Sequence, residues 1–425
     1  MRDRLPAQLS RKQGELHLEG VSLTEIAERF GTPCYIYSRR TIEANFRAFE
    51  EAFGDYPHLI CYAVKANSNL AVLQLLARLG AGFDIVSIGE LERVLRAGGD
   101  PSRIVFSGVG KREEELRRAL EVGILCFNVE VREELYRLAR LAGGLGRRAP
   151  ISIRVNPNVS PKTHPYIATG LRESKFGLDS ETAFQLYLEA AAIDGIEIVG
   201  IDCHIGSQIT ELAPFLEALD RILDLASRLE EKGISIRHID LGGGLGVEYR
   251  DETLPSPDRY VKALLGRLKG SYPLLIEPGR AIVAEAGVLL TRVNYLKETG
   301  IKNFAIVDAG MNDLLRPALY GADHPVWPVK RREGEEKIWE VVGPVCEAGD
   351  VLARERALVL EVGDLLAIGM AGAYGFVMSS NYNSRPRAPE VLVDGERMVL
   401  IRKRETLEDL WRGEVLLGSA HGRKL

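Results

Sequence analysis

The feature that most constrains the fold is a repeated alternation of apolar, strand-like runs with amphipathic helical stretches. The runs lie at residues 59–64, 82–87, 103–109, 124–129, 150–156, 198–206, 236–241 and 273–277. Between the first two, Leu70, Leu73, Leu76 and Leu79 mark one helix face, at the spacing of an amphipathic helix. Eight strand-then-helix units over roughly 240 residues predict an α/β fold, a (β/α)₈ TIM barrel.

A doubly wound open sheet is the structural rival. The one candidate dinucleotide loop, Gly242-Gly243-Gly244-Leu245-Gly246, lacks the G-x-G-x-x-G spacing and lies in a late unit, which counts against that sheet. One long interruption, Asn156 to Asp179, contains three prolines and two glycines. A loop of that length in a compact domain is more often functional than idle.

The alternation of strand-like and helical stretches ends after Arg280. Strand-like pieces with little helix between them follow at 286–296, 304–308, 338–342, 356–361 and 390–394. Turns such as Asp394-Gly395-Glu396 join them, so we expect an antiparallel β-sandwich or β-barrel domain at 285–425, after a barrel at 36–284. In the residues before 36, Ser22-Leu23-Thr24-Glu25 is a capping box that opens a helix through Phe30.

Composition narrows the class of protein. A chain of 425 residues is too long for one ordinary core. The formal net charge of −5 and the absence of a long Lys/Arg block argue against a nucleic-acid partner. No stretch has the length of a membrane span, and no secretory signal is seen. The cysteines are odd in number, widely spaced and without a Cys-x-x-Cys pair for a metal, which favours reduced thiols and the cytoplasm; they are Cys34, Cys61, Cys126, Cys203 and Cys346.

Lys65 is the most unusual residue of the first unit. It lies in Tyr62-Ala63-Val64-Lys65-Ala66-Asn67, at the end of an apolar run. Partial desolvation lowers the pKa of a lysine, as amine nucleophiles require. A strand-end lysine that merely reaches water is the alternative, and this stretch alone does not separate the two.

Other polar residues fall at the ends of later strands. In a barrel, the active site lies at the carboxyl ends of the strands. Asp84 lies within the second strand, His204 ends the sixth, Gly242 to Gly246 follow the seventh and Glu277-Pro278-Gly279-Arg280 ends the eighth. Each of these residues also has a purely structural explanation. The histidine can be a buried structural residue, the glycines can form a turn, and the carboxylate can pair with a local partner. Their convergence on one mouth predicts a site, and the glycine backbone suits an anion such as phosphate.

These motifs, in this order, resemble those of the fold-type III pyridoxal phosphate decarboxylases, and within them the diaminopimelate decarboxylase family most closely. The resemblance covers nearly the whole chain. It includes Tyr62–Asn67, His204–Gln208, Asp240–Gly246, Glu277–Arg280, Gly343-Pro344-Val345-Cys346-Glu347 and Ala373-Tyr374-Gly375. It implies that residues 1–35 join the C-terminal β domain and that the cofactor is pyridoxal 5'-phosphate.

The resemblance also implies cofactor roles. Lys65 would hold the cofactor covalently, His204 would stack on its ring and Glu277 would pair, ionised, with the ring nitrogen. The remaining cofactor contacts, phosphate contacts among them, would come from Asp84, Ser207, Gly242, Gly243, Gly244, Gly279, Arg280 and Tyr374.

Substrate contacts follow in the same way. Arg280, Arg316 and Tyr320 resemble the set that binds the far carboxylate of meso-2,6-diaminopimelate, and Tyr374 joins them. Glu347 would bind the neighbouring ammonium, and Cys346 would donate the proton after decarboxylation. The implied product is L-lysine. The implied assembly is a homodimer in which Cys346 and Glu347 of one subunit complete the site that holds Lys65 of the other.

Three other functions stay open at this point. A decarboxylase of ornithine, arginine or lysine would need no receptor for a far carboxylate. An alanine racemase shares the barrel and the cofactor, but would need a tyrosine base and a small neutral pocket. A non-catalytic binder or inactive regulatory relative would be expected to lack the β domain, Lys65 or Cys346, and all three are present.

Overall fold

The computed structural model describes residues 5–160, 175–250, 252–268 and 272–417. The chain forms two compact units. The barrel unit contains Arg39–Ala286 and Gly372–Val377, and the β unit contains Met1–Ser38, Gly287–Ala371 and Met378–Leu425. The boundary expected at residue 284 therefore omits a short return of the chain to the barrel unit, and this return includes Tyr374.

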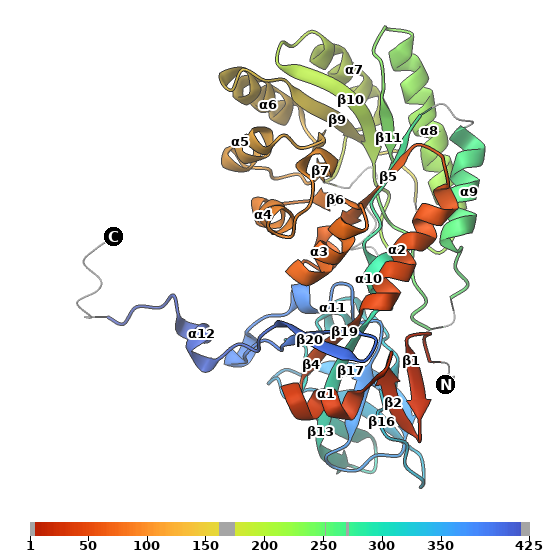
Figure 1. The fold of residues 1–425 in the computed structure, drawn as a ribbon, viewed down its shortest axis with the longest axis vertical. Helices are drawn as coiled ribbons and strands as arrows, with labels where there is room; N and C mark the ends of the chain where they lie inside the picture. Colours follow the sequence, from red (N-terminus) through yellow and green to blue (C-terminus); the bar gives the residue numbers. More distant parts are fainter. Residues whose placement is uncertain (1–4, 161–174, 251, 269–271, 418–425) are drawn as a thin grey trace. The chain divides into compact units, whose positions relative to one another are not determined.

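Eight parallel strands close into a barrel in the order β10-β11-β12-β5-β6-β7-β8-β9 (Figure 1). Their bounds are β5 (His58–Ala63), β6 (Gly82–Ile85), β7 (Ile104–Phe106), β8 (Cys126–Val129), β9 (Ala149–Val155), β10 (Ile196–Cys203), β11 (His238–Asp240) and β12 (Leu274–Ile276). Each lies within or beside one of the eight apolar runs. The TIM-barrel prediction is confirmed, and the open doubly wound sheet is excluded.

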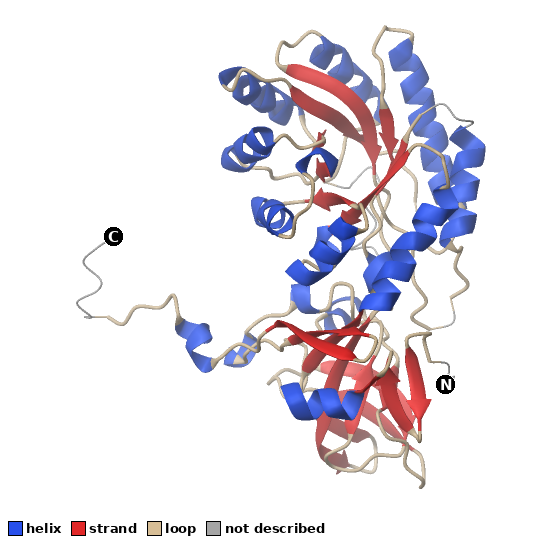
Figure 2. Cartoon of the chain, viewed as in Figure 1, coloured by secondary structure: helices blue, strands red, loops and turns tan. Residues whose placement is uncertain are grey.

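Helices lie outside the strands, as Figure 2 shows. They are α2 (Arg39–Phe53), α3 (Leu70–Arg78), α4 (Ile88–Arg96), α5 (Glu113–Val122), α6 (Arg132–Gly144), α7 (Ser180–Ala191), α8 (Ala213–Glu230), α9 (Pro257–Leu268) and α10 (Arg280–Val283), with short 3-10 helices η1 (Val64–Ala66) and η2 (Pro101–Arg103). In α3 the expected stripe is buried at Leu73 and Leu76. Most of the long loop expected to be functional, residues 161–174, lies outside the described residues.

The barrel interior is filled by small apolar side chains and a buried polar row. Leu59, Cys61, Val105, Cys126 and Leu275 pack together from four strands. Beside them, Ser152 Oγ lies 3.1 Å from Cys126 Sγ and 3.4 Å from Nε2 of His238. The His238 ring covers Gly200, where a Cβ atom would lie 2.3 Å from Nε2. Glycine is required there because the ring occupies the space of a side chain.

His238 makes the stability of the barrel depend on pH. Burial, and secondarily Arg237, lower its pKa from 6.5 to about 4. Between these values the unfolded chain binds more protons, so stability is lost as the pH falls from 6.5 towards 4. The contribution is about 3 kcal/mol above pH 6.5. Urea unfolding across this pH range should show a steeper pH dependence for the natural protein than for His238→Gln. Parallel pH profiles for the two proteins would contradict this prediction.

The β unit holds a nine-stranded sheet and a three-stranded sheet. The large sheet contains β4 (Cys34–Ser38), β13 (Gly287–Glu298), β14 (Asn303–Val307), β15 (Val326–Pro328), β16 (Lys337–Val342), β17 (Val351–Leu358), β18 (Leu365–Ile368), β19 (Glu390–Asp394) and β20 (Arg397–Arg402). The small sheet contains β1 (Leu9–Lys12), β2 (Glu15–Leu18) and β3 (Val21–Ser22). Short helices α11 (Arg316–Tyr320) and α12 (Leu407–Trp411) complete it, with α1 (Leu23–Phe30).

Most pairs in the large sheet are antiparallel, as predicted, but β14 pairs with β16 and β4 with β19 in parallel. The strand expected at 356–361 is β17, which begins five residues earlier and carries bulges opposite β16. The helix expected after Ser22 is confirmed: the Ser22 side chain accepts from the backbone N–H groups of Thr24 and Glu25.

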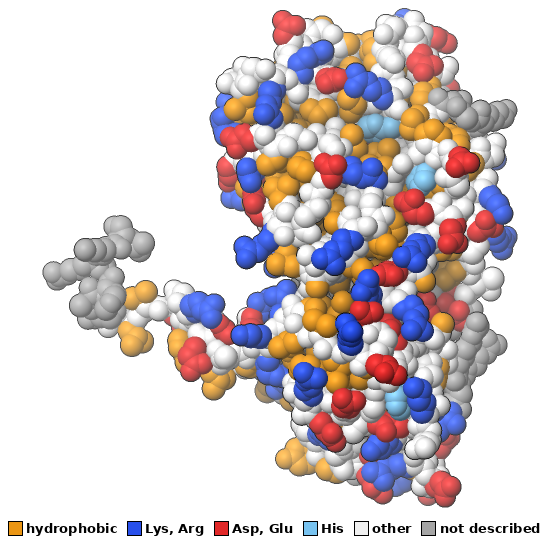
Figure 3. Space-filling view, viewed as in Figure 1, with side chains coloured by type: hydrophobic (Ala, Val, Ile, Leu, Met, Phe, Trp, Pro, Cys, Tyr) orange, Lys and Arg blue, Asp and Glu red, His pale blue; other side chains and the backbone are white. Residues whose placement is uncertain are grey.

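Two further features are the charged surface and the apolar character of the helices. On the face in Figure 3, basic and acidic side chains are interspersed, with no large basic area. Among the described residues, no helix combines the length and apolar character needed to span a bilayer.

Candidate active site

Lys65 lies in η1, directly after β5, and forms an ion pair with the buried carboxylate of Asp84 on β6. The two are neighbours because Ala63 and Asp84 are register partners in the barrel. Burial favours the neutral amine, but the charges of Asp84, Glu277 and Tyr374 outweigh it and raise the pKa of Lys65. The expectation of a lowered pKa is therefore wrong for this structure, because the sequence did not reveal the carboxylates around the amine.

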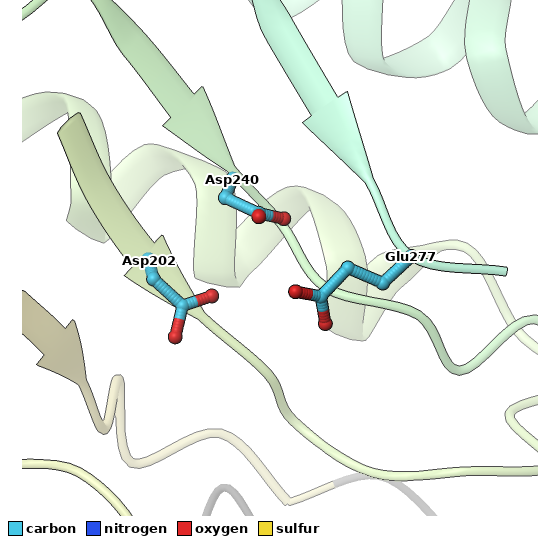
Figure 4. A group of neighbouring side chains, drawn as sticks. All are labelled: Asp202, Asp240 and Glu277. Atoms are coloured by element: carbon cyan, nitrogen blue, oxygen red, sulfur yellow. The ribbon is translucent and has the colours of Figure 1, made fainter. Parts of the chain in front are cut away.

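Three buried carboxylates face one another at the ends of the last three barrel strands (Figure 4). Oxygens of Asp202, Asp240 and Glu277 lie within 4.8 Å of one another. Burial, followed by the charges of Asp240, Asp84 and Asp202, raises the pKa of Glu277. Glu277 Oε1 accepts no hydrogen bond from any residue that the structure describes. The Lys65 ammonium opposes this rise but does not cancel it, so the pKa of Glu277 is higher than the ionised Glu277 of the resemblance would require.

His204 follows β10 and lies against the glycine turn after β11. Its Nδ1 accepts a hydrogen bond from Gly243 N at 3.1 Å, while Gly242 N donates to Asp240 Oδ1 at 2.8 Å. Burial, followed by the charges of Arg154 and Lys65, lowers the pKa of His204 well below 6.5. The imidazole is therefore neutral, and the accepted bond fixes its tautomer and orientation.

The glycine turn has no room for side chains. A Cβ atom on Gly242 would lie 2.6 Å from His204 Nδ1, and one on Gly243 would lie 2.2 Å from Glu277 O. Gly242 and Gly244 have φ values of 64° and 120°, which favour glycine. The turn is thus a close approach of backbone to backbone at the barrel mouth.

Arg280 joins several of the expected residues. Its guanidinium donates to Ser207 Oγ at 3.1 Å and to the Tyr249 hydroxyl at 2.7 Å, and lies 4.8 Å from the centre of the Tyr374 ring. Tyr374 belongs to the segment Gly372–Val377, which returns to the barrel unit. The backbone N of Tyr374 donates to Ala66 O at 2.8 Å. Asn67 Nδ2 donates to Gly372 O at 3.2 Å.

Sequence reasoning missed a buried charged chain beside this site. Lys111 pairs with Glu134 at 2.7 Å, Glu130 pairs with Arg154 at 2.9 Å, and Arg154 Nε lies 3.9 Å from Asp202 Oδ2. The signal was available in part: Arg154 and Asp202 are charged residues inside apolar strands, where burial is costly without a partner. Tyr249 gave no such signal, since it lies in a polar loop.

The β unit carries the other expected residues. Arg316 and Tyr320 are the first and last residues of α11, and Arg316 is buried. Cys346 and Glu347 lie exposed on the turn between β16 and β17. The other four cysteines are free and buried.

The Cys346 turn is built around the buried Asp350. Its carboxylate accepts from Val345 N at 2.7 Å and Met311 N at 2.6 Å. Cys346 N donates to Asn383 Oδ1 at 2.9 Å. The exposed thiol is therefore carried on a fixed backbone.

Comparisons with known proteins identify the family. Residues 39–284 match the family described as "Pyridoxal-dependent decarboxylase, pyridoxal binding domain". A protein of Pseudomonas aeruginosa named diaminopimelate decarboxylase is 61% identical over 409 residues, which cover 96% of this chain and 99% of that protein. The chain belongs to the diaminopimelate decarboxylase family.

Solved structures of diaminopimelate decarboxylases share the fold. The Helicobacter pylori enzyme, complexed with L-lysine, has a TM-score of 0.89 and 46% identity, covering 92% of this chain and 98% of that one. The M. jannaschii enzyme, also in complex with L-lysine, has a TM-score of 0.93 and 40% identity, covering 96% and 98%.

Proposed function

We propose that this chain catalyses the pyridoxal phosphate-dependent decarboxylation of meso-2,6-diaminopimelate to L-lysine and carbon dioxide, acting at the D centre. This makes it a carboxy-lyase of lysine biosynthesis. The observation that carries the proposal is the meeting of Lys65, neutral His204, the glycine turn and Glu277 at one barrel mouth. It occurs in a chain that aligns over nearly its full length with diaminopimelate decarboxylases.

The barrel mouth fits pyridoxal phosphate on three counts. Lys65 supplies an amine for the cofactor aldehyde. Glu277 Oε1, which accepts no hydrogen bond among the described residues, offers a buried acceptor for a protonated ring nitrogen. The glycine turn forms a cradle in which Cβ atoms would clash. A ring nitrogen that carries a proton would also lower the raised pKa of Glu277 and hold it ionised.

Bound pyridoxal phosphate supplies an electron-withdrawing ring that accepts the electrons released when carbon dioxide leaves. The neutral His204 imidazole offers a flat surface for that ring, held by the bond from Gly243. Asp84 pairs with the free Lys65 ammonium, and would stabilise that ammonium whenever the amine is not joined to the cofactor. Cys346 is assigned as the proton donor to the product carbon.

The phosphate is assigned to Ser207, Gly244, Gly279, Arg280 and Tyr374. Gly242 and Gly243 are assigned to the shape of the turn, since their N–H groups already donate to Asp240 and His204. Gly279 allows close packing, because a Cβ atom there would lie 2.9 Å from the Cβ atoms of Ala63 and Ala66.

The substrate assignment rests on Arg316. By resemblance, Arg280, Tyr320 and Tyr374 are assigned with it to the far carboxylate, and Glu347 is assigned to the far ammonium. An arginine fork matches a carboxylate, and each charged hydrogen bond contributes roughly 1.5–3 kcal/mol. Ornithine, arginine and lysine have no far carboxylate, so a polyamine-type decarboxylase has no use for this buried guanidinium. An alanine racemase is disfavoured in the same way, because a buried guanidinium does not suit a small neutral side chain.

Arg316→Ala should lower kcat/KM for diaminopimelate by about 100-fold or more, because two charged hydrogen bonds to the carboxylate are lost. Arg316→Lys keeps the charge without the planar fork and should fall between the two. Arg354→Ala, at a side chain 67% exposed on β17, is the control and should keep full activity. Faster turnover of ornithine or arginine than of diaminopimelate by the natural protein would overturn the substrate assignment.

We further propose a cytoplasmic homodimer with shared active sites. Five free cysteines suit a reducing compartment. The exposure of Cys346 and Glu347, on a turn held by Asp350, supports a role for them in a site completed by a second subunit.

A further inference from the structure

The guanidinium of Arg316 is held by a buried histidine. Arg316 is 5% exposed and His324 is 0% exposed. Arg316 Nη1 lies 3.1 Å from His324 Nε2, and His324 Nδ1 lies 2.9 Å from Gly369 O. A guanidinium only donates and a carbonyl only accepts, so Nε2 accepts from Arg316 and Nδ1 carries the proton. His324 is therefore neutral, in a single tautomer set by its two partners.

The backbone around His324 is anchored on two strands. Its carbonyl oxygen accepts from Arg356 Nη2 on β17 at 3.0 Å, and Arg356 also pairs with Asp323. Gly369, just after β18, donates through its backbone N to Pro325 O at 2.9 Å. The imidazole thus occupies a fixed position, and so does the Nη1 atom bound to it.

A neutral partner has a consequence that a carboxylate would not have. A carboxylate beside Arg316 would cancel the positive charge and compete with an incoming anion. The uncharged imidazole orients the planar guanidinium and adds no negative charge of its own. Fixing a long side chain in advance also removes ordering cost from the binding step.

We propose that His324 is a positioning residue that orients Arg316 for the far carboxylate of the substrate, and so helps the enzyme prefer a diacid amino acid. The proposal rests on the proposed function, in which Arg316 binds that carboxylate. It adds a positioning residue that acts on the substrate through Arg316.

Two ligands that are not decarboxylated during the measurement allow recognition of the far carboxylate to be measured separately from catalysis. As the product, L-lysine retains the L-centre carboxylate of diaminopimelate, which is the carboxylate far from the reacting D centre. 1,5-Diaminopentane has the same chain and no carboxylate. The ratio of their inhibition constants against diaminopimelate turnover therefore reports recognition of the carboxylate. General damage to the site weakens both ligands and leaves the ratio unchanged.

Two variants of His324 separate its two hydrogen bonds. His324→Asn places a donor near Gly369 O and removes the acceptor for Arg316, whereas His324→Gln places an acceptor near Arg316. We expect the preference for L-lysine over diaminopentane to fall about 10-fold in His324→Asn and to stay within about 3-fold of the natural value in His324→Gln. His238→Gln, at a buried histidine of the barrel, is the control and should leave the ratio unchanged.

Equal ratios in His324→Asn and His324→Gln, whether high or low, would overturn the proposal. Failure of the proposed function looks different. In that case the natural protein would not prefer L-lysine over diaminopentane, or Arg316→Ala would keep the full preference. If Arg316→Ala erases the preference and His324→Asn retains it, the role of Arg316 stands and that of His324 is refuted.

Discussion

Lys65→Ala should lose decarboxylase activity by a factor on the order of 10⁴ or more, the scale seen when a covalent catalytic group is removed. The amine lies at the end of β5, beside the carboxylates of Asp84 and Glu277. In the natural protein loaded with pyridoxal phosphate, borohydride should fix the cofactor on the peptide that contains Lys65. The raised pKa of the free amine is no obstacle, because the carboxylates that raise it can also stabilise a protonated link to the cofactor.

The control for this experiment is Lys262→Ala, at a side chain 71% exposed on α9. It should retain both activity and the borohydride label. Label on a peptide without Lys65, or uptake of cofactor and full activity in Lys65→Ala, would refute the assignment.

Co-expression of two inactive variants should restore activity if the sites are shared. Lys65→Ala lacks the cofactor amine and Cys346→Ala lacks the proton donor, so each homodimer should be nearly inactive. A heterodimer that pairs them has one site with both residues intact and one with neither. Random pairing of equal amounts then gives about one quarter of the natural activity, and purified heterodimers about one half.

Different tags on the two variants allow the heterodimer to be isolated and verified. Sites contained within one subunit predict no rescue, because neither chain has both residues. Co-expression of the double variant Lys65→Ala/Cys346→Ala with the natural chain is a second test of shared sites. Its heterodimer should be nearly inactive when sites are shared, since each site then lacks one residue, and half active when they are not.

The barrel was predictable because its strands are buried on both faces. A run such as Leu59–Val64 is apolar throughout, so it stands out without knowledge of its partners. The β unit was less predictable, since its strands depend on distant partners. β4 pairs with β13 and β19, from far along the chain, and no local pattern in Cys34–Ser38 indicates those partners.

The site, too, was predictable in part from local sequence and in part not. Strand-end placement brought Lys65, His204, the glycine turn and Glu277 together on physical grounds. It could not give their protonation, because the pKa of Lys65 depends on Asp84 and Glu277, which are distant in sequence. Tyr374 was assigned to the wrong unit, since a six-residue return, Gly372–Val377, has no signature in composition.

The placement of β4 bears on how the chain is made. All five residues of this strand are buried, and its two neighbours begin at Gly287 and Glu390. At ribosomal rates of about 5–20 residues per second, roughly 250 residues must be added before β13 exists, which takes on the order of ten seconds or longer. Throughout that time Cys34–Ser38 is an apolar segment with two unpaired edges on a nascent chain, while the barrel emerges behind it. Synthesis of this enzyme therefore includes an interval in which both edges of the strand are open to wrong pairing, and this interval ends only when β13 and β19 have been added.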